Sequence, residues 1–277
     1  MTTTVPPGLA ELTEIMAYAD FATSAPTSVR EALGLGVLHV GSARALAIRE
    51  DPSHFFNRAG GFGADSPITV DDLVRVCDFY RERGVSQGSL MIAPPLLPPD
   101  WAAIAAKLGL AENSRFIKLG CDIETLPTAA GLAPLDPGWR VGVVEAHQAQ
   151  EWATVMMTTF GFTTPDLIEM AASCVGKANW RQYAVWAGER IVAVGSVFLN
   201  GECADMFGGA TLPEARGRGA QSALLTARVR AATGEGCRWL VAETGAEGPG
   251  EHNPSLHNMV RVGFEPLYER ANWLWRA

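Results

Sequence analysis

The chain has 277 residues, 48% of them hydrophobic and 19% charged, a balance typical of a globular protein that excludes a fibrous or disordered chain. Its formal net charge is −8 and it has no run of basic residues, so it lacks the electrostatic pattern of a nucleic-acid-binding protein. No apolar stretch approaches the ~18 residues of a membrane span, which predicts no membrane partner.

The five cysteines are odd in number and widely spaced along the chain. They are Cys77, Cys121, Cys174, Cys203 and Cys237. No two of them form a Cys-x-x-Cys pair, so we predict no metal site. Isolated thiols in apolar stretches are typical of a reducing compartment, and we find no N-terminal targeting pattern, so we expect a cytoplasmic protein.

The first half alternates between helix and strand patterns from about residue 69, whereas the residues before it are weakly patterned. The spacing of apolar residues predicts a helix over 70–83 and a strand over 89–93. After a proline-rich loop, we expect a second helix over 101–108 and a last strand over 115–122. These elements predict an α/β domain.

A join between two domains is expected at residues 126–138. This stretch contains Pro127, Pro134 and Pro137 with small residues between them, a composition typical of linkers. We therefore predict one domain over 1–130 and a second over 138–277, each of ordinary domain size.

The second half opens with a strand, two helices and a meander of three antiparallel strands. The expected ranges are 139–145 for the strand, 149–159 and 165–174 for the helices, and 182–186, 191–199 and 203–207 for the meander. Asn200-Gly201 joins the last two strands, and both positions tolerate the positive φ that a tight hairpin requires.

A glycine-rich loop over 216–221 leads directly into a helical pattern. Backbone N–H groups at the start of a helix are unpaired, and the helix dipole adds partial positive charge there. Gly217 and Gly219 let a ligand approach the backbone closely, while Arg216 and Arg218 offer cationic donors. The segment therefore predicts a pyrophosphate-binding loop.

The order of elements around this loop is informative. After the helix come a strand over 239–243, a helix over 255–261 and a last strand through 273–275. The loop places Arg216, Gly219 and Gln221 after a Pro-Glu-x-Arg lead-in, and Asn258 precedes Gly263-Phe264. With these motifs the second half resembles the GNAT superfamily of acyl-CoA-dependent N-acyltransferases. The resemblance implies an α/β (α+β) fold, a mixed and mostly antiparallel sheet flanked by helices, and acetyl-CoA as co-substrate.

The resemblance also implies which residues bind the cofactor. They are Ala210, Thr211, Leu212, Arg216, Gly217, Arg218, Gly219, Ala220, Gln221, Ser222 and Asn258. A backbone N–H near Gly209 is expected to stabilise the oxyanion. Two positions depart from the family pattern: Gln221 replaces a glycine or alanine, and Met259 replaces a tyrosine that protonates the departing thiolate.

An attacking amine must be a free base, so we looked for a proton acceptor near the expected thioester position. Asp205 lies in an apolar run and Glu243 at the end of a strand, and burial would raise the pKa of either carboxyl. Tyr268 is the candidate acid, with the Ser255 hydroxyl as an alternative. Other polar residues of the region, Glu202, His252 and His257, are expected at the surface.

The two halves share one order of elements: helix, glycine, strand, loop, helix, glycine and strand. Such repetition favours a duplicated unit. In the first half the glycine-rich segment 57–63 does not open the helix, and Asp65 would repel a pyrophosphate. We therefore predict two tandem GNAT-like domains, the first degenerate and without cofactor; an unrelated α/β domain stays open as the alternative.

The function predicted from these features is N-acetylation of a small-molecule amine by direct attack on acetyl-CoA. Two alternatives stay open: a non-catalytic acyl-CoA-binding regulatory or interaction module, favoured by Met259, and a protein N-acetyltransferase. The oligomeric state is not determined by the sequence, which is compatible with a pseudo-dimeric monomer or a homodimer.

Overall fold

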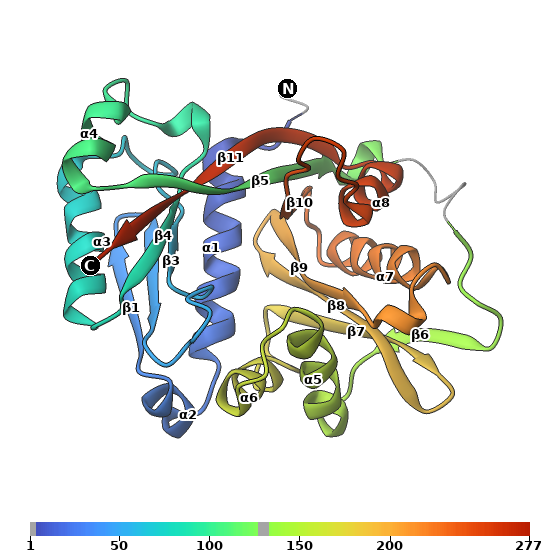
Figure 1. Cartoon of the computed structure of the whole chain (residues 1–277). Coiled ribbons are helices and arrows are strands. Elements are labelled where there is room, and N and C mark those ends of the chain that lie inside the picture. The colour runs from blue at the N-terminus through green and yellow to red at the C-terminus, as the bar shows by residue number, and fades with distance from the viewer. Residues whose placement is uncertain (1–3, 127–132) are drawn as a thin grey trace.

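A computed structural model of the chain describes residues 4–126 and 133–277. It forms one continuous sheet of eleven strands in the order β1-β2-β3-β4-β11-β5-β10-β9-β8-β7-β6, flanked by helices (Figure 1). The predicted mixed, mostly antiparallel sheet is thereby confirmed. No helix in the described part of the chain is long and apolar enough to cross a bilayer.

The first half contains every element predicted for it and five more. Its elements are α1 (Pro7–Thr23), α2 (Thr27–Ala32), β1 (Leu35–Val40), β2 (Ala43–Ile48), β3 (Arg58–Gly60), α3 (Val70–Glu82), β4 (Gln87–Met91), α4 (Trp101–Leu108) and β5 (Ala111–Asp122). The sequence pattern missed α1 because this helix is buried on more than one side. Glu11 and Glu14 are buried together with Ile15 and Phe21, so no amphipathic periodicity marks it.

The second half follows the predicted order closely. Its elements are β6 (Trp139–Val143), α5 (Ala149–Thr159), α6 (Pro165–Ala172), β7 (Trp180–Ala187), β8 (Arg190–Asn200), β9 (Cys203–Thr211), α7 (Ala220–Gly234), β10 (Trp239–Gly245), α8 (Pro254–Val262) and β11 (Glu265–Arg276). Strands β7 to β9 form the predicted antiparallel meander, β6 pairs antiparallel to β7 at its edge, and β10 pairs parallel to β9.

Helix ends follow local chemistry in both halves. Thr69 and Asp72 form a reciprocal capping box at the start of α3, and Asn253 caps α8 by accepting from two backbone N–H groups. Gly109 and Gly263 end α4 and α8 in the left-handed conformation that glycine adopts without a Cβ clash. These equivalent glycines give the two halves the same turn into their last strand.

The last strands of the two halves are exchanged. Strand β5 of the first half lies between β11 and β10, and β11 of the second half lies between β4 and β5. In Figure 1 the red β11 runs toward the blue half while the green β5 runs toward the orange one. The halves are therefore interlocked. Of the predicted join at 126–138, residues 127–132 lie outside the described residues.

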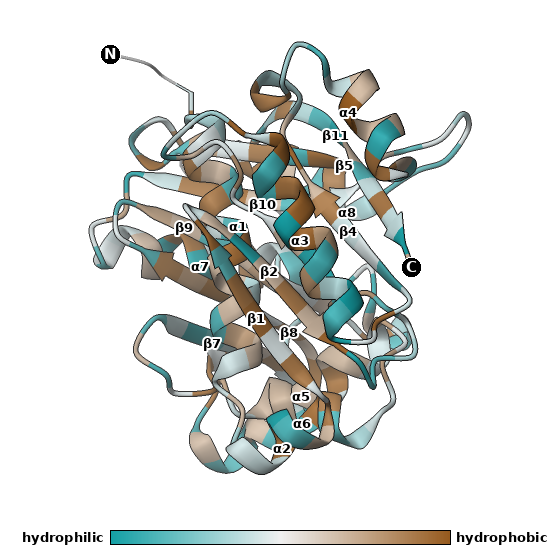
Figure 2. Cartoon of the chain, turned by 90° about the vertical axis from the view of Figure 1, so that its left-hand side faces the viewer, coloured by the Kyte–Doolittle hydropathy of each residue, from teal (hydrophilic) through white to brown (hydrophobic). Residues whose placement is uncertain are grey.

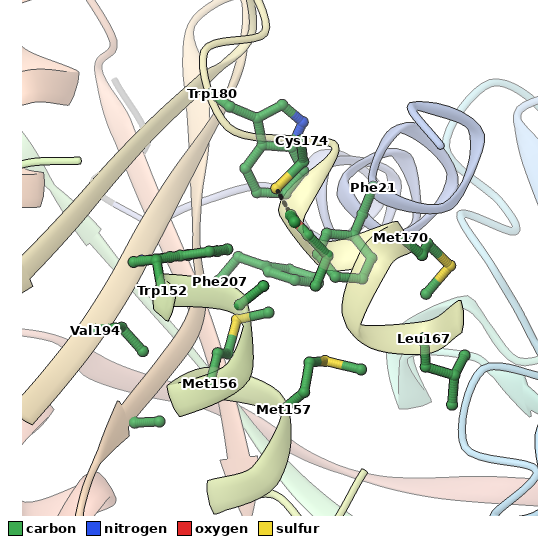
Figure 3. Packing of buried hydrophobic residues seen from close by; sticks show 14 of the residues in the cluster. Phe21, Trp152, Met156, Met157, Leu167, Met170, Cys174, Trp180, Val194 and Phe207 are labelled. Carbon is green, nitrogen blue, oxygen red and sulfur yellow. Dashed lines mark hydrogen bonds between the residues drawn. The ribbon is translucent and has the colours of Figure 1, made fainter. Parts of the chain in front are cut away.

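Helix α1 connects the cores of both halves. Phe21 packs against Phe56 of the first half and against Trp180 and Phe207 of the second, with ring centroids 6.1, 6.1 and 5.0 Å away. Figure 3 shows Phe21 among methionines of α5 and α6. The Trp180 indole also donates to Asp20 of α1 at 2.6 Å. Figure 2 shows the apolar residues concentrated on the strands.

Candidate active site

The site forms where β9 and β10 separate. Their parallel pairing ends at Asp205 and Val241, and beyond this pair the strands diverge. A β-bulge follows on β9, where Gly208 and Gly209 lie opposite the single residue Gly195 of β8. Gly208 has a φ of +62°, and a Cβ there would lie 2.5 Å from the Met156 sulfur, so only glycine fits.

A cavity of about 410 Å³ opens at this separation and is lined from both faces of the sheet. Met206 and Phe207 are neighbours on β9 and so point to opposite faces. Met206 packs with Leu225 of α7, and Phe207 packs with residues of α1 and α5. Since all three line the cavity, it connects the α7–α8 face to the α1–α5 face.

The predicted phosphate loop precedes α7 as the sequence indicated. No side chain of the described residues caps this helix, and its N-cap residue Gly219 has a φ of +77°. Arg216 donates to the Thr211 carbonyl at 3.4 Å, and Arg218 lies 3.5 Å from Asp136. The first-turn N–H groups are thus left without a side-chain acceptor, as an anion site requires.

The segment before β6 packs against this loop. A Cβ at Gly219 would lie 2.0 Å from the Pro134 carbonyl oxygen, and the Asp136 N–H donates to the Arg218 carbonyl at 3.1 Å. A larger residue at Gly219 would therefore displace this segment as well as obstruct a phosphate. A substitution at Arg216 therefore tests phosphate binding by the loop more directly than one at Gly219.

The other residues predicted to bind cofactor differ in their surroundings. Ala210, Ala220 and Ser222 are buried and do not line the cavity. Leu212 donates its N–H to the Val192 carbonyl and Thr211 accepts from Arg216. Gly217 has no atom near its Cβ direction and is open to approach.

Gln221, which departs from the family motif, connects α7 to α8. Its amide donates to the Ser255 hydroxyl at 3.4 Å and accepts from the Asn258 amide at 2.6 Å. Gln221, Ser255 and Met259 all line the cavity, and Met259 is buried. The position of the missing tyrosine is therefore filled by an apolar wall.

Two predicted carboxylates, Asp205 and Glu243, both line the cavity at the separation of the strands. Burial raises the pKa of the Asp205 carboxyl to about 7. Burial likewise raises the pKa of Glu243 to about 7, although Arg270 opposes the shift. Glu243 is ion-paired with Arg270, whereas Asp205 forms no ion pair among the described residues.

A buried charge network that the sequence did not indicate lies behind Glu243. Glu11 and Glu14 of α1 pair with Arg270 of β11, and Glu14 also pairs with Lys118 of β5. Burial alone would raise the pKa of Glu14, but Arg270 and Lys118 together hold it well below its usual range. The two cations are thus balanced by Glu11 and Glu14, which leaves Glu243 as an excess carboxylate.

Tyr268, the candidate acid, belongs to this network and does not line the cavity. Its hydroxyl donates to Glu11 at 2.8 Å. Burial raises the pKa of this phenol, and the Glu11 charge adds to the effect. The structure thus brings Asp205 and Glu243 together at the cavity and leaves Tyr268 outside it.

Arg228 is a further residue that the sequence did not indicate. Its guanidinium is buried and donates to the carbonyls of Leu224 and Ser196 at 3.2 and 3.3 Å. A Cβ at Gly195 would lie 3.1 Å from its Cζ, so the guanidinium lies directly beneath the bulge. Burial lowers the pKa of Arg228 to about 10, which still leaves it cationic at the wall of the cavity.

The residues expected at the surface are indeed exposed: Glu202, His252 and His257. His257 lies 2.9 Å from Glu247, whose carboxylate also accepts the Asn253 N–H at the start of α8. Ligand atoms of Glu247, His252 and His257 lie within 4.8 Å of one another, although the sequence predicts no metal site. The capping contact to Asn253 already accounts for the position of Glu247.

In the described residues of the first half, the positions that correspond to the site are filled by other side chains. Gly84 and Gly236 are equivalent glycines that precede β4 and β10. Five residues after each glycine, Ser89 of β4 pairs with Arg58, whereas Val241 of β10 pairs with Asp205. Arg58 therefore occupies the position in the first half that Asp205 occupies in the second. A Cβ at Gly61 of the adjoining loop would lie 2.9 Å from Ile15 of α1. The capping box at Thr69 already occupies the start of α3.

No family model and no curated protein matches the sequence. Among solved structures, a GCN5-related N-acetyltransferase from Kribbella flavida is 16% identical, with a TM-score of 0.60 over 90% of this chain and 93% of that one. A tandem GNAT protein from the clavulanic acid biosynthesis pathway is 13% identical, with a TM-score of 0.61 over 96% of each chain. A GCN5-related N-acetyltransferase from Sphaerobacter thermophilus is 12% identical, with a TM-score of 0.59 over 98% of this chain and 94% of that one. These similarities extend over both halves, and the chain therefore has the tandem GNAT fold.

Proposed function

We propose that the protein is an acetyl-CoA-dependent N-acetyltransferase that acts on a small-molecule amine. The observation that carries this proposal is the cavity through the sheet, which connects the uncapped end of α7 to the carboxylates of Asp205 and Glu243, each with a pKa of about 7. Cofactor and acceptor can thus approach one point from opposite faces, as a direct transfer requires.

The cofactor would lie along the separated edge of β9. Its pyrophosphate would accept from the first-turn N–H groups of α7, with Arg216 and Arg218 as cationic donors. The pantetheine arm would pair with the β9 backbone beyond Asp205, where β10 no longer does. The thioester would then reach the bulge at Gly208 and Gly209, where a backbone N–H can bind the oxyanion.

In the proposed reaction the amine nitrogen attacks the thioester carbon, so that a C–N bond forms and the C–S bond breaks. Asp205 accepts the ammonium proton and passes it to solvent, and Glu243 is the second candidate base. Asp205 suits this role better because Glu243 is already ion-paired with Arg270. A thiol has an ordinary pKa of about 8.5, so the thiolate can depart without a protein acid and Met259 does not prevent turnover.

Two measurements test the proposal. Calorimetry should show acetyl-CoA binding, and a thiol-release assay with a panel of amines should show turnover that Asp205→Asn lowers by at least about 100-fold. No binding at hundreds of micromolar would refute cofactor recognition. Tight binding without thiol release from any amine would instead favour the non-catalytic module.

A protein acceptor is less compatible with the cavity. Glu14, Tyr18 and Phe21 of α1 wall its acceptor side, whereas a peptide would need an open groove. The first half is thus assigned the role of an acceptor wall without cofactor of its own. We place the reaction in the cytoplasm as part of the same proposal, because all five cysteines are buried and unpaired, which suits a reducing compartment.

A further inference from the structure

We propose that the acceptor is a monoamine carried on a flat apolar body, such as an arylalkylamine. This inference rests on the proposed acetyl transfer and names its substrate class. It follows from the contrast between the walls of the acceptor side of the cavity and its polar end.

The walls on the α1–α5 face are aromatic and thioether side chains from both halves. Tyr18 and Phe21 come from α1, Phe55 precedes β3, and Met157 and Phe162 come from α5 and the loop after it. Phe55 and Phe162 pack 5.2 Å apart, so residues of the two halves close one continuous surface. Flat rings and polarisable sulfur form favourable contacts with an aromatic ligand.

The charged side chains on the acceptor side of the cavity are already paired. Glu14 of α1 lines this side, but it is ion-paired with the buried Lys118 and Arg270. Arg58 contacts the aromatic wall, with its Cζ 4.1 and 3.9 Å from the ring centroids of Tyr18 and Phe55, and it donates to the Phe55 carbonyl at 2.9 Å.

The other charged residues of the cavity lie near the proposed thioester position. Asp205 and Glu243 occur where the strands separate, and Arg228 lies beneath the bulge. The polar groups that could bind an amine are therefore gathered at this point.

This distribution of charge selects against two kinds of ligand. A polyamine or aminosugar would bury its additional ammonium or hydroxyl groups against the rings without partners, which costs free energy for each group. A long acyl chain on the cofactor could occupy the apolar wall, but it would press hydrocarbon against Asp205 and Glu243. A single amine on an aromatic body satisfies both ends of the cavity.

The experiment compares acceptors with the full-length protein and acetyl-CoA. We expect kcat/KM for 2-phenylethylamine to exceed that for ethanolamine and for 1,4-diaminobutane by at least about tenfold, as loss of apolar contacts in a pocket predicts. Equal or better turnover of the two polar amines would overturn the inference and leave acetyl transfer intact. Release of thiol with none of the amines would overturn the proposed function as well.

A variant pair tests the wall itself. Phe160 lines the cavity but its side chain is 51% exposed, so Phe160→Ala should fold normally. It should raise KM for 2-phenylethylamine by about tenfold and leave 1,4-diaminobutane turnover and acetyl-CoA affinity unchanged. Val143→Ala, at an exposed position of β6 outside the cavity, is the matched control. An equal effect of Phe160→Ala on both amines, or a preference for octanoyl-CoA over acetyl-CoA, would refute this use of the wall.

Discussion

Burial gives the Asp205 carboxyl a pKa of about 7, so its protonation changes in the pH range where the proposed reaction would run. The same burial makes the charged form costly to the folded protein. A base of this kind is useful for catalysis and unfavourable for stability, and the two effects can be measured separately.

The pH dependence of turnover is the first prediction. With saturating acceptor, kcat should rise about tenfold per pH unit below pH 7 and level off above it, because the base must be ionised. Steady-state thiol release between pH 5.5 and 9 measures this profile. Glu202→Gln, at an exposed position, should leave the inflection in place, whereas a profile unchanged by Asp205→Asn would exclude Asp205 as the base.

The stability of the same variant is the second prediction. The folded-state pKa of Asp205 lies above its ordinary value of 3.8, so the folded protein binds this proton more tightly than the unfolded chain does. Stability is therefore lost as the pH rises from about 4 to 7. Asp205→Asn should raise the free energy of unfolding at pH 8 by ~1 kcal/mol or more and have little effect at pH 4. Urea denaturation at both pH values checks this.

At the scale of elements, α1 serves the stability of the fold, whereas α7 is proposed to bind the cofactor. Helix α1 is surrounded by both halves and brings two carboxylates to buried cations, whereas α7 presents an uncapped end to the place of the cofactor. The role of α1 is therefore tested by measuring the stability of the protein, and that of α7 by measuring its affinity for acetyl-CoA.

Removal of one carboxylate from α1 gives the third prediction. Glu14→Gln removes the carboxylate that pairs with the fully buried Lys118, whose ammonium has no other ion-pair partner among the described residues. Breaking a buried ion pair on one side typically costs about 3 kcal/mol or more, so the urea midpoint should fall substantially. Glu31→Gln on α2, which is exposed, should leave it unchanged. Comparable midpoints for the two variants would contradict the role of the network.

Cofactor affinity gives the fourth prediction. Arg216→Ala should raise the Kd for acetyl-CoA by about tenfold, the effect of losing one hydrogen bond to a charged group. Arg230→Ala removes the same charge from an exposed position further along α7 and should leave the Kd within about twofold. Calorimetry at low ionic strength measures both. An equal loss of acetyl-CoA affinity in the two variants would indicate that the net charge of the protein, and not a contact between Arg216 and the cofactor, determines binding.

The sequence predicted most elements from α3 onward because their ends are marked locally, by Thr69, Asn200-Gly201 and the glycines after α4 and α8. It also predicted Asp205 and Glu243 as candidate bases, since a carboxylate within or at the end of an apolar strand can be recognised from the sequence alone. It missed α1, whose one sequence signal was the helical spacing of Glu11, Glu14 and Tyr18 on a single face. The partners of Glu11 and Glu14 lie over 100 residues away, and no local pattern could indicate that pairing.

At the scale of the whole molecule, the exchange of β5 and β11 determines what can fold alone. Strand β10 has β5 as its neighbour on one side, and β11 lies between two strands of the first half. A second half produced without the first would expose these edges and the buried Arg270.

Division of the chain between the halves gives the fifth prediction. Residues 133–277 expressed alone should aggregate and release no thiol from acetyl-CoA. Co-expression with residues 1–129 should restore a soluble complex, because the exchanged strands need no covalent link to pair. Size-exclusion chromatography and the thiol-release assay measure both outcomes, and an active, monomeric fragment 133–277 would contradict the prediction.

The exchanged strands also bear on the history of the molecule. Because each half completes its sheet with the last strand of the other, a deletion that removes either half would also unfold the half that remains. In its proposed role as an acceptor wall without cofactor, the first half would therefore stay indispensable to the second. A gene that encodes such a protein can be inherited only as a whole.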